Sequence, residues 1–271
     1  MSESSNDGVL QRMTQLIESW EGRHDRRCIF LRCYADMTAA TLGAIQDRRF
    51  HDNPWTGRLL GVFVGYYFRA LNAYEQGIAA VPAPWKWAHD LTQLPTTLPV
   101  EALVLGINAH INHDLALAVS DLLCSEWADL DEAERSKRHD DFLRINDIIA
   151  ETTRLVQHDV LERYDHFLRG ADPIVSPAIH GAEWECGRLI KCWRDEAWSH
   201  GIQLVEATSA EERERLRHAI EQGAVHRVRV VISTIELRHE LLARPIEELA
   251  RLHPHPPVAA RFRSAQVTAQ S

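Results

Sequence analysis

The sequence predicts an all-α protein, a single-domain bundle of about seven helices with one long loop rich in proline and tryptophan. Apolar residues recur at spacings of three and four through almost every segment, which is the period of a helix. No segment alternates convincingly between apolar and polar residues, as a half-buried strand would. The 271 residues are 45% hydrophobic, which suffices for a sizeable core, although length alone does not decide between one domain and two.

Three helices are expected in the first part of the chain. An apolar stripe predicts the first helix over 10–20, and a second stripe predicts the next over 28–45. The third is expected over 55–76. It follows a break at Asn53-Pro54, where Pro54 suits the first turn of a helix.

Residues 77–99 are expected to form the long loop. They contain four prolines and two tryptophans, a composition that disfavours a long regular element but supplies apolar surface. Such a loop could cover a cleft or serve as the contact face of a homo-oligomer. Pro99 then opens a helix that is expected to run to about residue 127.

The remaining helices begin at recognisable caps. The stretch "DLDEAERS" predicts the start of a long polar helix, and "TSAEE" matches a capping box before a helix over 210–242. Another helix is expected over 180–206, after a break at 169–180. The helices flanking that break are too one-sided to be stable alone, so we predict one all-α domain over 1–251, followed by a disordered tail over 252–271.

Composition narrows the range of partners and compartments. The formal net charge is −9 and the basic residues are scattered, whereas binding to nucleic acid requires clustered cations. The N-terminus does not resemble a signal peptide, and there is no uninterrupted apolar run of membrane-spanning length. The five cysteines form neither a CxxC pair nor a zinc ribbon. We therefore expect a cytoplasmic protein without nucleic-acid or membrane partners.

The stretch "GINAHINHDLALAV" at 106–119 points to a functional site. It places His110, His113 and Asp114 in an apolar helix, together with Asn108 and Asn112. Buried polar groups cost free energy unless each finds a partner, so this segment needs either a structural network or a chemical role. Helical spacing puts the histidines and the aspartate in one sector and the two asparagines in another.

Two interpretations of this motif remain open. In the first, His110 and Asp114 bind a divalent metal ion, zinc, iron or manganese, with Asp52 from the helix junction at "FHDNPW" as a third ligand. In the second, His110 and Asp114 form a hydrogen-bonded pair that ties buried helices together. Neighbouring histidines and acids elsewhere, such as those at 139–141, are interpreted as a solvated face.

A second group of candidate residues lies in "EWECGRLIKCWRDEAWSHG". Trp198 follows Arg194 by four residues, so the guanidinium can lie against the indole and offer its donors to an anionic group of a substrate. The alternative is that Arg194 pairs with Asp114 or Asp52. Asn108 and Asn112 are further candidates for substrate binding, and the proton donors proposed on this basis are His113 and Tyr67.

The stretches "GINAHINHDL", "FHDNPWTGRLLGVFVGYYFRAL" and "RDEAW" resemble an uncharacterised bacterial domain-of-unknown-function family with a G-I-N-A-H-I-N-x-D-L motif. The resemblance covers roughly residues 28–205 and implies no activity. His51 and His113 stand outside the pattern. The positions that match it are Phe50, Asp52, Pro54, Trp55, Tyr67, Ala70, Leu71, Gly106, Asn108, His110, Asn112, Asp114, Arg194 and Trp198.

These observations favour an enzyme that acts on a small organic molecule. The leading hypothesis is a divalent-metal-dependent, hydrolase-type enzyme in which the ion activates water or a carbonyl group. The first alternative is a metal-free isomerase, lyase or cyclase with His110 as the general base. The second is a non-catalytic ligand-binding or interaction protein, in which the buried polar cluster only specifies packing.

Overall fold

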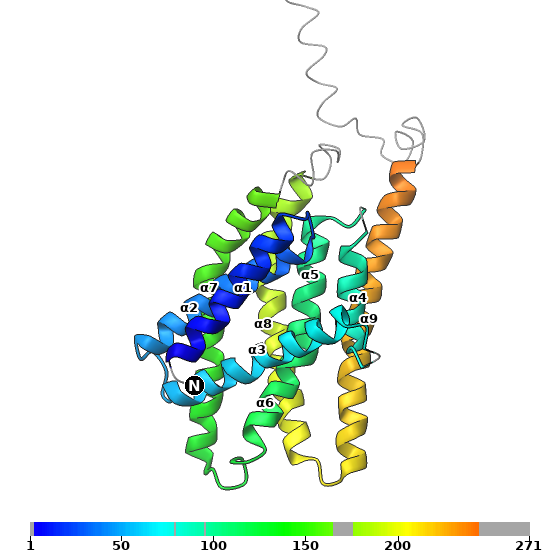
Figure 1. Ribbon diagram of the computed structural model, residues 1–271. Helices are drawn as coiled ribbons and strands as arrows, with labels where there is room; N and C mark the ends of the chain where they lie inside the picture. The colour runs from blue at the N-terminus through cyan, green and yellow to red at the C-terminus, as the bar shows by residue number, and fades with distance from the viewer. Residues whose placement is uncertain (1–2, 79, 95, 165–175, 244–271) are drawn as a thin grey trace, which may run out of the picture. The chain divides into compact units, whose positions relative to one another are not determined.

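The computed structural model describes residues 3–78, 80–94, 96–164 and 176–243, and within these ranges it contains helices and no strands. This confirms the all-α prediction. The helices are α1 (Glu3–Glu21), α2 (Arg27–Gln46), α3 (Asn53–Glu75), α4 (Ala83–Thr92), α5 (Pro99–Ala109), η1 (His110–Leu115), α6 (Ala116–Leu123), α7 (Glu132–Tyr164), α8 (Ser176–Glu206) and α9 (Ala210–Ala243) (Figure 1). Because α5, η1 and α6 form one continuous helix, the described part of the chain has eight helices.

The additional helix is α4, which lies inside the segment that was expected to be an irregular loop. That expectation was wrong because the prolines mark helix starts instead of preventing a helix. Pro82 is the N-cap of α4, Pro84 lies in its first turn, and Pro99 opens α5. Proline is well tolerated in a first helical turn, where its missing N–H would have no intrahelical partner.

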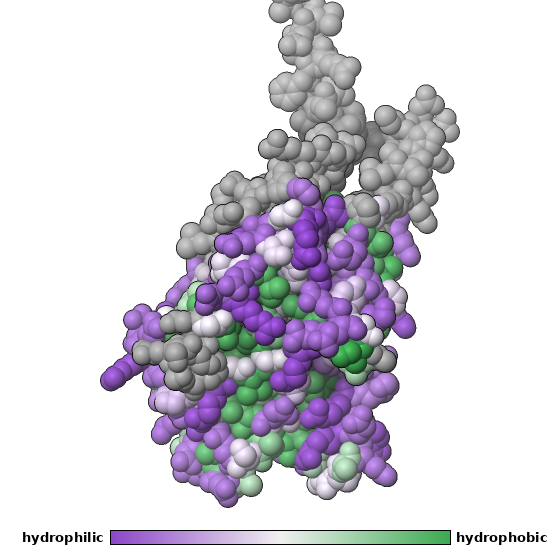
Figure 2. Space-filling model, viewed as in Figure 1, coloured by the Kyte–Doolittle hydropathy of each residue, from purple (hydrophilic) through white to green (hydrophobic). Residues whose placement is uncertain are grey.

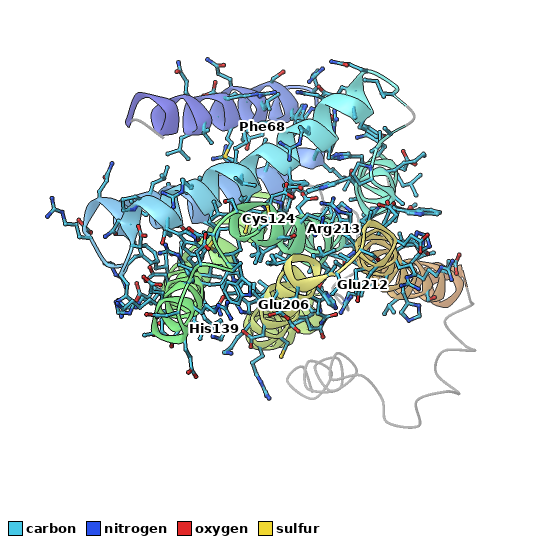
Figure 3. The ribbon with its side chains drawn as sticks, turned by 90° about the horizontal axis from the view of Figure 1, so that it is seen from below. Phe68, Cys124, His139, Glu206, Glu212 and Arg213 are labelled. Atoms are coloured by element: carbon cyan, nitrogen blue, oxygen red, sulfur yellow. The ribbon has the colours of Figure 1, made fainter. Side chains whose placement is uncertain are left out.

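The predicted caps of the later helices are present. Asp131 and Glu134 cap α7 reciprocally, since each carboxylate accepts a hydrogen bond from the other residue's backbone N–H, at 2.8 and 2.9 Å. At α9 the Ser209 hydroxyl accepts from the backbone N–H of Glu212 at 3.1 Å. Figure 3, a view from below, labels Glu206 at the end of α8 and Glu212 in the first turn of α9. These local hydrogen bonds explain why the starts of both helices were predictable.

The helix that runs through α5, η1 and α6 forms the centre of the bundle. Nearly every residue from 101 to 120 is buried, which is expected for a helix that is apolar on all sides. The helix packs against α8 along η1 and α6, and against α2 and α4 along α5. Helix α2 packs in turn against α1 and α7, while α3 crosses in front of the central helix in the view of Figure 1.

Two glycines allow this close packing. A Cβ on Gly106 would lie 2.3 Å from the Phe30 ring of α2. A Cβ on Gly201 of α8 would lie 2.5 Å from Val119. Both distances are far below van der Waals contact, so α2 and α8 approach the central helix only because these side chains are absent. The motif glycine is therefore explained by packing.

The chain divides into two units, residues 1–229 and residues 230–271. Every helix from α1 to α8 belongs to the first unit, as does the first part of α9. The described part of the second unit is the remainder of α9, residues 230–243. The predicted boundary at residue 251 and the predicted tail at 252–271 lie outside the described residues.

Two helical stretches have the length and apolar composition of a membrane span, Arg27–Gln46 and Pro99–Leu123. The most apolar window of the second is 94% buried inside the protein, which is also typical of a core helix. On the face drawn in Figure 2 polar residues cover most of the surface, and apolar residues reach it mainly in the middle, over α3.

Candidate functional site

The histidine-rich motif adopts a π-helix, η1, in the middle of the central helix. Hydrogen bonds from residue i to i+5 widen this turn, and single π-turns of this kind occur frequently at functional sites. All six residues of η1 are buried. The polar side chains of the motif therefore need partners inside the protein.

Asp114 is the hub of a buried hydrogen-bond cluster. Its side chain has no exposed surface, and its two oxygens meet three ring nitrogens. His113 Nδ1 lies 2.8 Å from Oδ1, while His110 Nδ1 lies 3.3 Å and Trp85 Nε1 2.8 Å from Oδ2. The indole N–H of Trp85 can only donate. Because an ionised carboxylate can only accept, we assign the Nδ1 proton to both histidines.

The electrostatics of the cluster support this assignment. Burial raises the pKa of the Asp114 carboxyl, but hydrogen bonds from His110 and His113 outweigh it, so the pKa lies below its usual value. Burial lowers the pKa of His110, and the positive charge of Arg194 lowers it further. The hydrogen bond and negative charge of Asp114 raise the pKa, but the net shift is a decrease. An ionised Asp114 beside a neutral His110 leaves Nε2 as the basic nitrogen of the imidazole.

The imidazole of His110 forms part of the wall of a cavity of about 100 Å³. The wall comes from α2, α3, the α5–η1 region, α7 and α8, all in the first unit. The ring of Phe63 stacks on His110 at 3.6 Å between centroids, and that of Tyr34 meets it edge-on at 4.2 Å. The lining residues are Phe30, Cys33, Tyr34, Met37, Thr38, Thr41, Leu59, Leu60, Phe63, Ile107, His110, Ile111, Leu115, Ile145, Ile149, Ile190 and Arg194.

Four residues of this wall carry a buried polar atom without a hydrogen-bond partner in the described part of the protein. The atoms are His110 Nε2, Tyr34 Oη, Thr38 Oγ1 and Arg194 Nη2. A buried polar group left unsatisfied costs about 1–3 kcal/mol. Most buried polar atoms in native proteins are satisfied, and four of the ten buried side-chain atoms without a partner in the described structure lie around this one cavity, which makes it the candidate site.

Arg194 is buried in the cavity wall, with only 3% of its surface exposed, and its partners differ from those expected. Its Nε donates to the side-chain oxygen of Asn146, and its guanidinium lies over the Phe142 ring at 4.7 Å. Burial lowers the pKa of the guanidinium to about 10. Arg194 was expected to stack on Trp198. Instead, Trp198 packs against His139 and Phe142. Figure 3 labels His139 on α7.

Asn108 and Asn112 form a structural tie outside the cavity wall. Asn112 Nδ2 donates to Asn108 Oδ1 at 3.0 Å, and Asn108 Nδ2 donates to the backbone oxygen of Ala224 on α9 at 2.9 Å. The prediction that this pair occupies a separate face of the helix agrees with the structure. The cavity-lining residues do not include them, so the geometry gives no support to their predicted role in substrate binding.

Asp52 takes part in a different network, at the junction of α2 and α3. Its Oδ1 accepts from the Trp55 backbone N–H at 2.9 Å and caps α3, while its Oδ2 pairs with Arg138 at 2.7 Å. The backbone N–H groups of His51 and Asp52 donate to the two oxygens of Asp141, at 2.7 and 2.8 Å. Asp141 is fully buried, so the expectation of a solvated face at 139–141 was wrong at this position.

The predicted metal-ligand set is consequently not assembled. Asp52 is engaged at the junction, and the two oxygens of Asp114 already meet three nitrogens. Within the described residues no group of three or more His, Cys, Asp or Glu side chains is arranged to bind a metal ion. The ligand set Asp52, His110 and Asp114 does not fit a divalent ion, and we derive no chemistry from it.

The two predicted proton donors also lie away from the cavity wall. His113 is held on Asp114 and serves to position it. Tyr67 lines a separate space of about 10 Å³ together with Trp85 and His89, and its ring centroid is 6.2 Å from that of His110. Neither residue is among those that line the larger cavity.

The sequence interpretation missed several residues that the structure brings to the site. They are Tyr34 and Thr38 on α2, Trp85 on α4 and Asn146 on α7. The residues on α2 carried a usable signal, because hydroxyl side chains at 34, 38 and 41 recur at helical spacing in an otherwise apolar helix. Trp85 and Asn146 carried none, since their roles depend on helices that are distant in sequence.

The comparisons with known proteins agree with the resemblance noted in the sequence. The family DUF5995, described as a family of unknown function, matches residues 6–234. No match was found among curated proteins, and none was found among solved structures. Because the match spans most of the chain, the protein belongs to the DUF5995 family, whose function is unknown.

Proposed function

We propose that this protein is an enzyme that acts on a small, largely apolar molecule by general acid–base chemistry, with His110 as the base. One observation carries the proposal. His110 has one ring nitrogen on a fully buried carboxylate, while its other nitrogen is buried without a partner in the described structure, in the wall of a cavity. A base with an orienting carboxylate behind it is a recurring arrangement in enzymes.

The cluster around Asp114 supports the role of base. Asp114 orients the imidazole through Nδ1, and His113 and Trp85 hold Asp114 in turn. The lowered pKa of His110 keeps the ring neutral near pH 7, which is the form that accepts a proton at Nε2. The protonated ring would then be stabilised by the carboxylate of Asp114.

Tyr34 is the candidate proton donor on the same wall. Its ring meets His110 edge-on, and its hydroxyl has no partner in the described part of the chain. Burial raises the pKa of Tyr34 well above its usual value, the negative charge of Asp114 adds to this effect, and the nearby Thr38 hydroxyl opposes it weakly. Tyr34 therefore stays protonated at neutral pH and can donate a hydrogen bond or a proton to a substrate oxygen.

The lining of the cavity favours proton transfer at carbon. Most of the wall is aliphatic or aromatic, so charges that develop on a bound molecule would be stabilised mainly by His110, Tyr34, Thr38 and Arg194. Isomerases, lyases and cyclases that move a proton next to a carbonyl group require only a base and a hydrogen-bond donor. We assign this reaction class to the site.

Hydrogen–deuterium exchange tests the assignment directly. The full chain is incubated in D₂O with a panel of small aldehydes, ketones and esters, and deuterium incorporation beside the carbonyl group is followed by NMR. We expect exchange with at least one compound and a decrease of about 10²-fold or more in the His110→Gln variant. The matched control is His139→Gln, because His139 lies on α7 against Trp198, outside the cavity wall, and should leave the rate unchanged.

Two other outcomes would redirect the proposal. If chelator abolishes exchange and added zinc, iron or manganese restores it, the enzyme is metal-dependent and the metal-free mechanism fails. If panel compounds bind but the wild-type chain exchanges none of them, the protein is a ligand-binding protein without this activity. Elemental analysis of untagged protein purified without chelator accompanies both measurements.

A further inference from the structure

Arg194 gives the cavity wall a positive charge. Arg194 is its only cation, and no carboxylate belongs to the lining residues that the structure describes. The negative charge of the adjacent Asp195 also acts on Arg194, although Asp195 binds Lys191 at 2.8 Å and its side chain is 42% exposed. The ionised Asp114 lies behind His110 and does not line the cavity. Asn146, the hydrogen-bond partner of Arg194, is neutral. A buried charge is costly unless it is paired, so this arrangement favours a ligand that brings a negative charge.

The unsatisfied atoms around Arg194 include two donors, while the Oδ1 of the adjacent Asp195 is an unsatisfied acceptor outside the cavity wall. Arg194 Nη2 and the neighbouring Asn146 Nδ2 are both buried without an acceptor among the described residues. The Asn146 amide is oriented by its oxygen, which accepts from Arg194 Nε, so its nitrogen can only donate. Thr38 and Tyr34 add hydroxyl donors on the same wall. A ligand group with acceptor oxygens would satisfy the donors of Arg194 and Asn146, while the acceptor His110 Nε2 is left for the reacting part of the ligand.

We propose that the cavity binds a small monocarboxylate, with its carboxylate on Arg194 and its apolar body among the aliphatic and aromatic residues of the wall. This inference names the substrate class of the proposed enzyme and uses the same cavity. One cation with a neutral His110 beside it matches a single negative charge. A phosphate monoester carries nearly two negative charges, and the wall offers no second cation to balance them.

The volume limits the size of the apolar body. A cavity of about 100 Å³ is comparable to engineered protein cavities of about 150 Å³ that accept benzene. We therefore expect the best ligands to have an apolar part of about five or six carbons. Longer chains should gain no affinity without displacing wall residues, since close-packed interiors resist expansion.

Binding to the wild-type full chain is the primary test. Isothermal titration calorimetry compares hexanoate with hexanamide, which has the same shape without the charge, and with hexyl phosphate. We expect hexanoate to bind at least about tenfold more tightly than either. Equal affinities for hexanoate and hexanamide, or tighter binding of hexyl phosphate, would overturn the inference. This comparison needs no variant and so does not depend on the folding of a mutant.

Variants then test whether Arg194 binds the carboxylate of the ligand. Arg194→Gln should reduce the affinity for hexanoate at least about tenfold and leave that for hexanamide within about threefold. Arg188→Gln, an exposed position on the same helix, is the matched control and should change neither. Circular dichroism confirms folding of both variants. Unchanged hexanoate binding in folded Arg194→Gln would show that the anion does not contact this residue.

The failure of this inference can be distinguished from the failure of the proposed function. His110→Gln should abolish exchange but retain hexanoate binding within about threefold, because the base does not hold the anion. Carboxylate binding that requires Arg194, with no exchange activity in wild-type protein, would support the ligand class and reject the acid–base enzyme. Exchange of neutral compounds that is unchanged in Arg194→Gln would support the acid–base enzyme and reject the carboxylate as the ligand class.

Discussion

The polar cluster around Asp114 and the junction around Asp141 both bury charged side chains, but only the first adjoins a cavity wall with unused hydrogen-bonding capacity among the described residues. The indole N–H of Trp55 at the junction is also buried without a partner in the described structure, but it does not line the cavity. At the junction, Asp141 accepts from two backbone N–H groups and Asp52 is occupied by a helix N-terminus and Arg138. Beside Asp114, the wall residues His110 and Tyr34 each retain a buried polar atom without a partner in the described structure. Polar groups that are fully satisfied indicate a structural role, whereas those that converge unsatisfied on a cavity indicate a site.

The largest expected effect is on Asp114. Asp114→Ala should lower the free energy of unfolding by about 3–5 kcal/mol, because His110, His113 and Trp85 would lose a buried charged partner. Urea titration monitored by circular dichroism measures this loss in the free energy of unfolding. Asp114→Asn retains one acceptor oxygen and should lose less. A loss below about 1 kcal/mol in the alanine variant would contradict the assignment of Asp114 as the hub.

The junction should respond more weakly. Asp141→Ala removes the acceptor of two backbone N–H groups and should lower the free energy of unfolding by about 2–3 kcal/mol. The control is Asp140→Ala, one residue away on a side chain that is 52% exposed, which should have no measurable effect. Because the junction is not part of the cavity wall, folded Asp141→Ala should bind hexanoate like wild type. Weakened binding would mean that the two regions are coupled.

Acid titration should separate the two regions. Near the Asp114 cluster, burial lowers the pKa of His89 to about 3, against weaker opposing effects of nearby carboxylates, and burial also lowers that of His110. The unfolded chain then binds more protons, so stability should fall as the pH decreases below about 6.5, by up to about 1.4 kcal/mol per pH unit for each group. His89→Gln should reduce this slope, and an unchanged slope would contradict the prediction.

At the junction, the stability should change only at a lower pH. Burial raises the pKa of Asp52, but the hydrogen bonds from the Trp55 N–H and Arg138 lower it by more. The folded-state pKa of Asp52 therefore lies below its usual value. Its contribution is present above about pH 4 and is lost only as the pH falls below that. Asp52→Asn should therefore lower the stability by a constant amount between about pH 4 and 6.5 and leave the slope of the profile in that range unchanged.

The smallest effects, which differ in sign, come from two buried threonines. Thr38 in the cavity wall has a hydroxyl without a partner among the described residues, so Thr38→Val should raise the free energy of unfolding by about 1 kcal/mol. The Thr56 hydroxyl donates to the Asp52 backbone oxygen at 3.2 Å, so Thr56→Val should lower it by about 1 kcal/mol. Matching signs in thermal denaturation would contradict the contrast between the regions.

Local patterns in the sequence determined most of the fold. The helical period, the caps at Asp131 and Ser209 and the break at Asn53-Pro54 predicted most of the helix ends to within about four residues, because each depends on neighbours along the chain. The exception is α1, which begins at Glu3 and not at residue 10 as expected. The apolar helix with histidines at its centre was correctly expected to cross the interior. Helix α4 was missed because its prolines were interpreted as a reason for an irregular loop.

The sequence alone also determined that His110, Asp114 and Arg194 are buried polar residues in need of partners. Only the tertiary structure decided which partners they have. Helix packing directed Asp52 to Arg138 instead of His110, brought Trp85 to Asp114, and placed Tyr34 and Arg194 on one cavity wall. Helical periodicity arises from hydrogen bonds a few residues apart, whereas these contacts depend on how helices from across the whole chain pack together, and no spacing in the sequence records that.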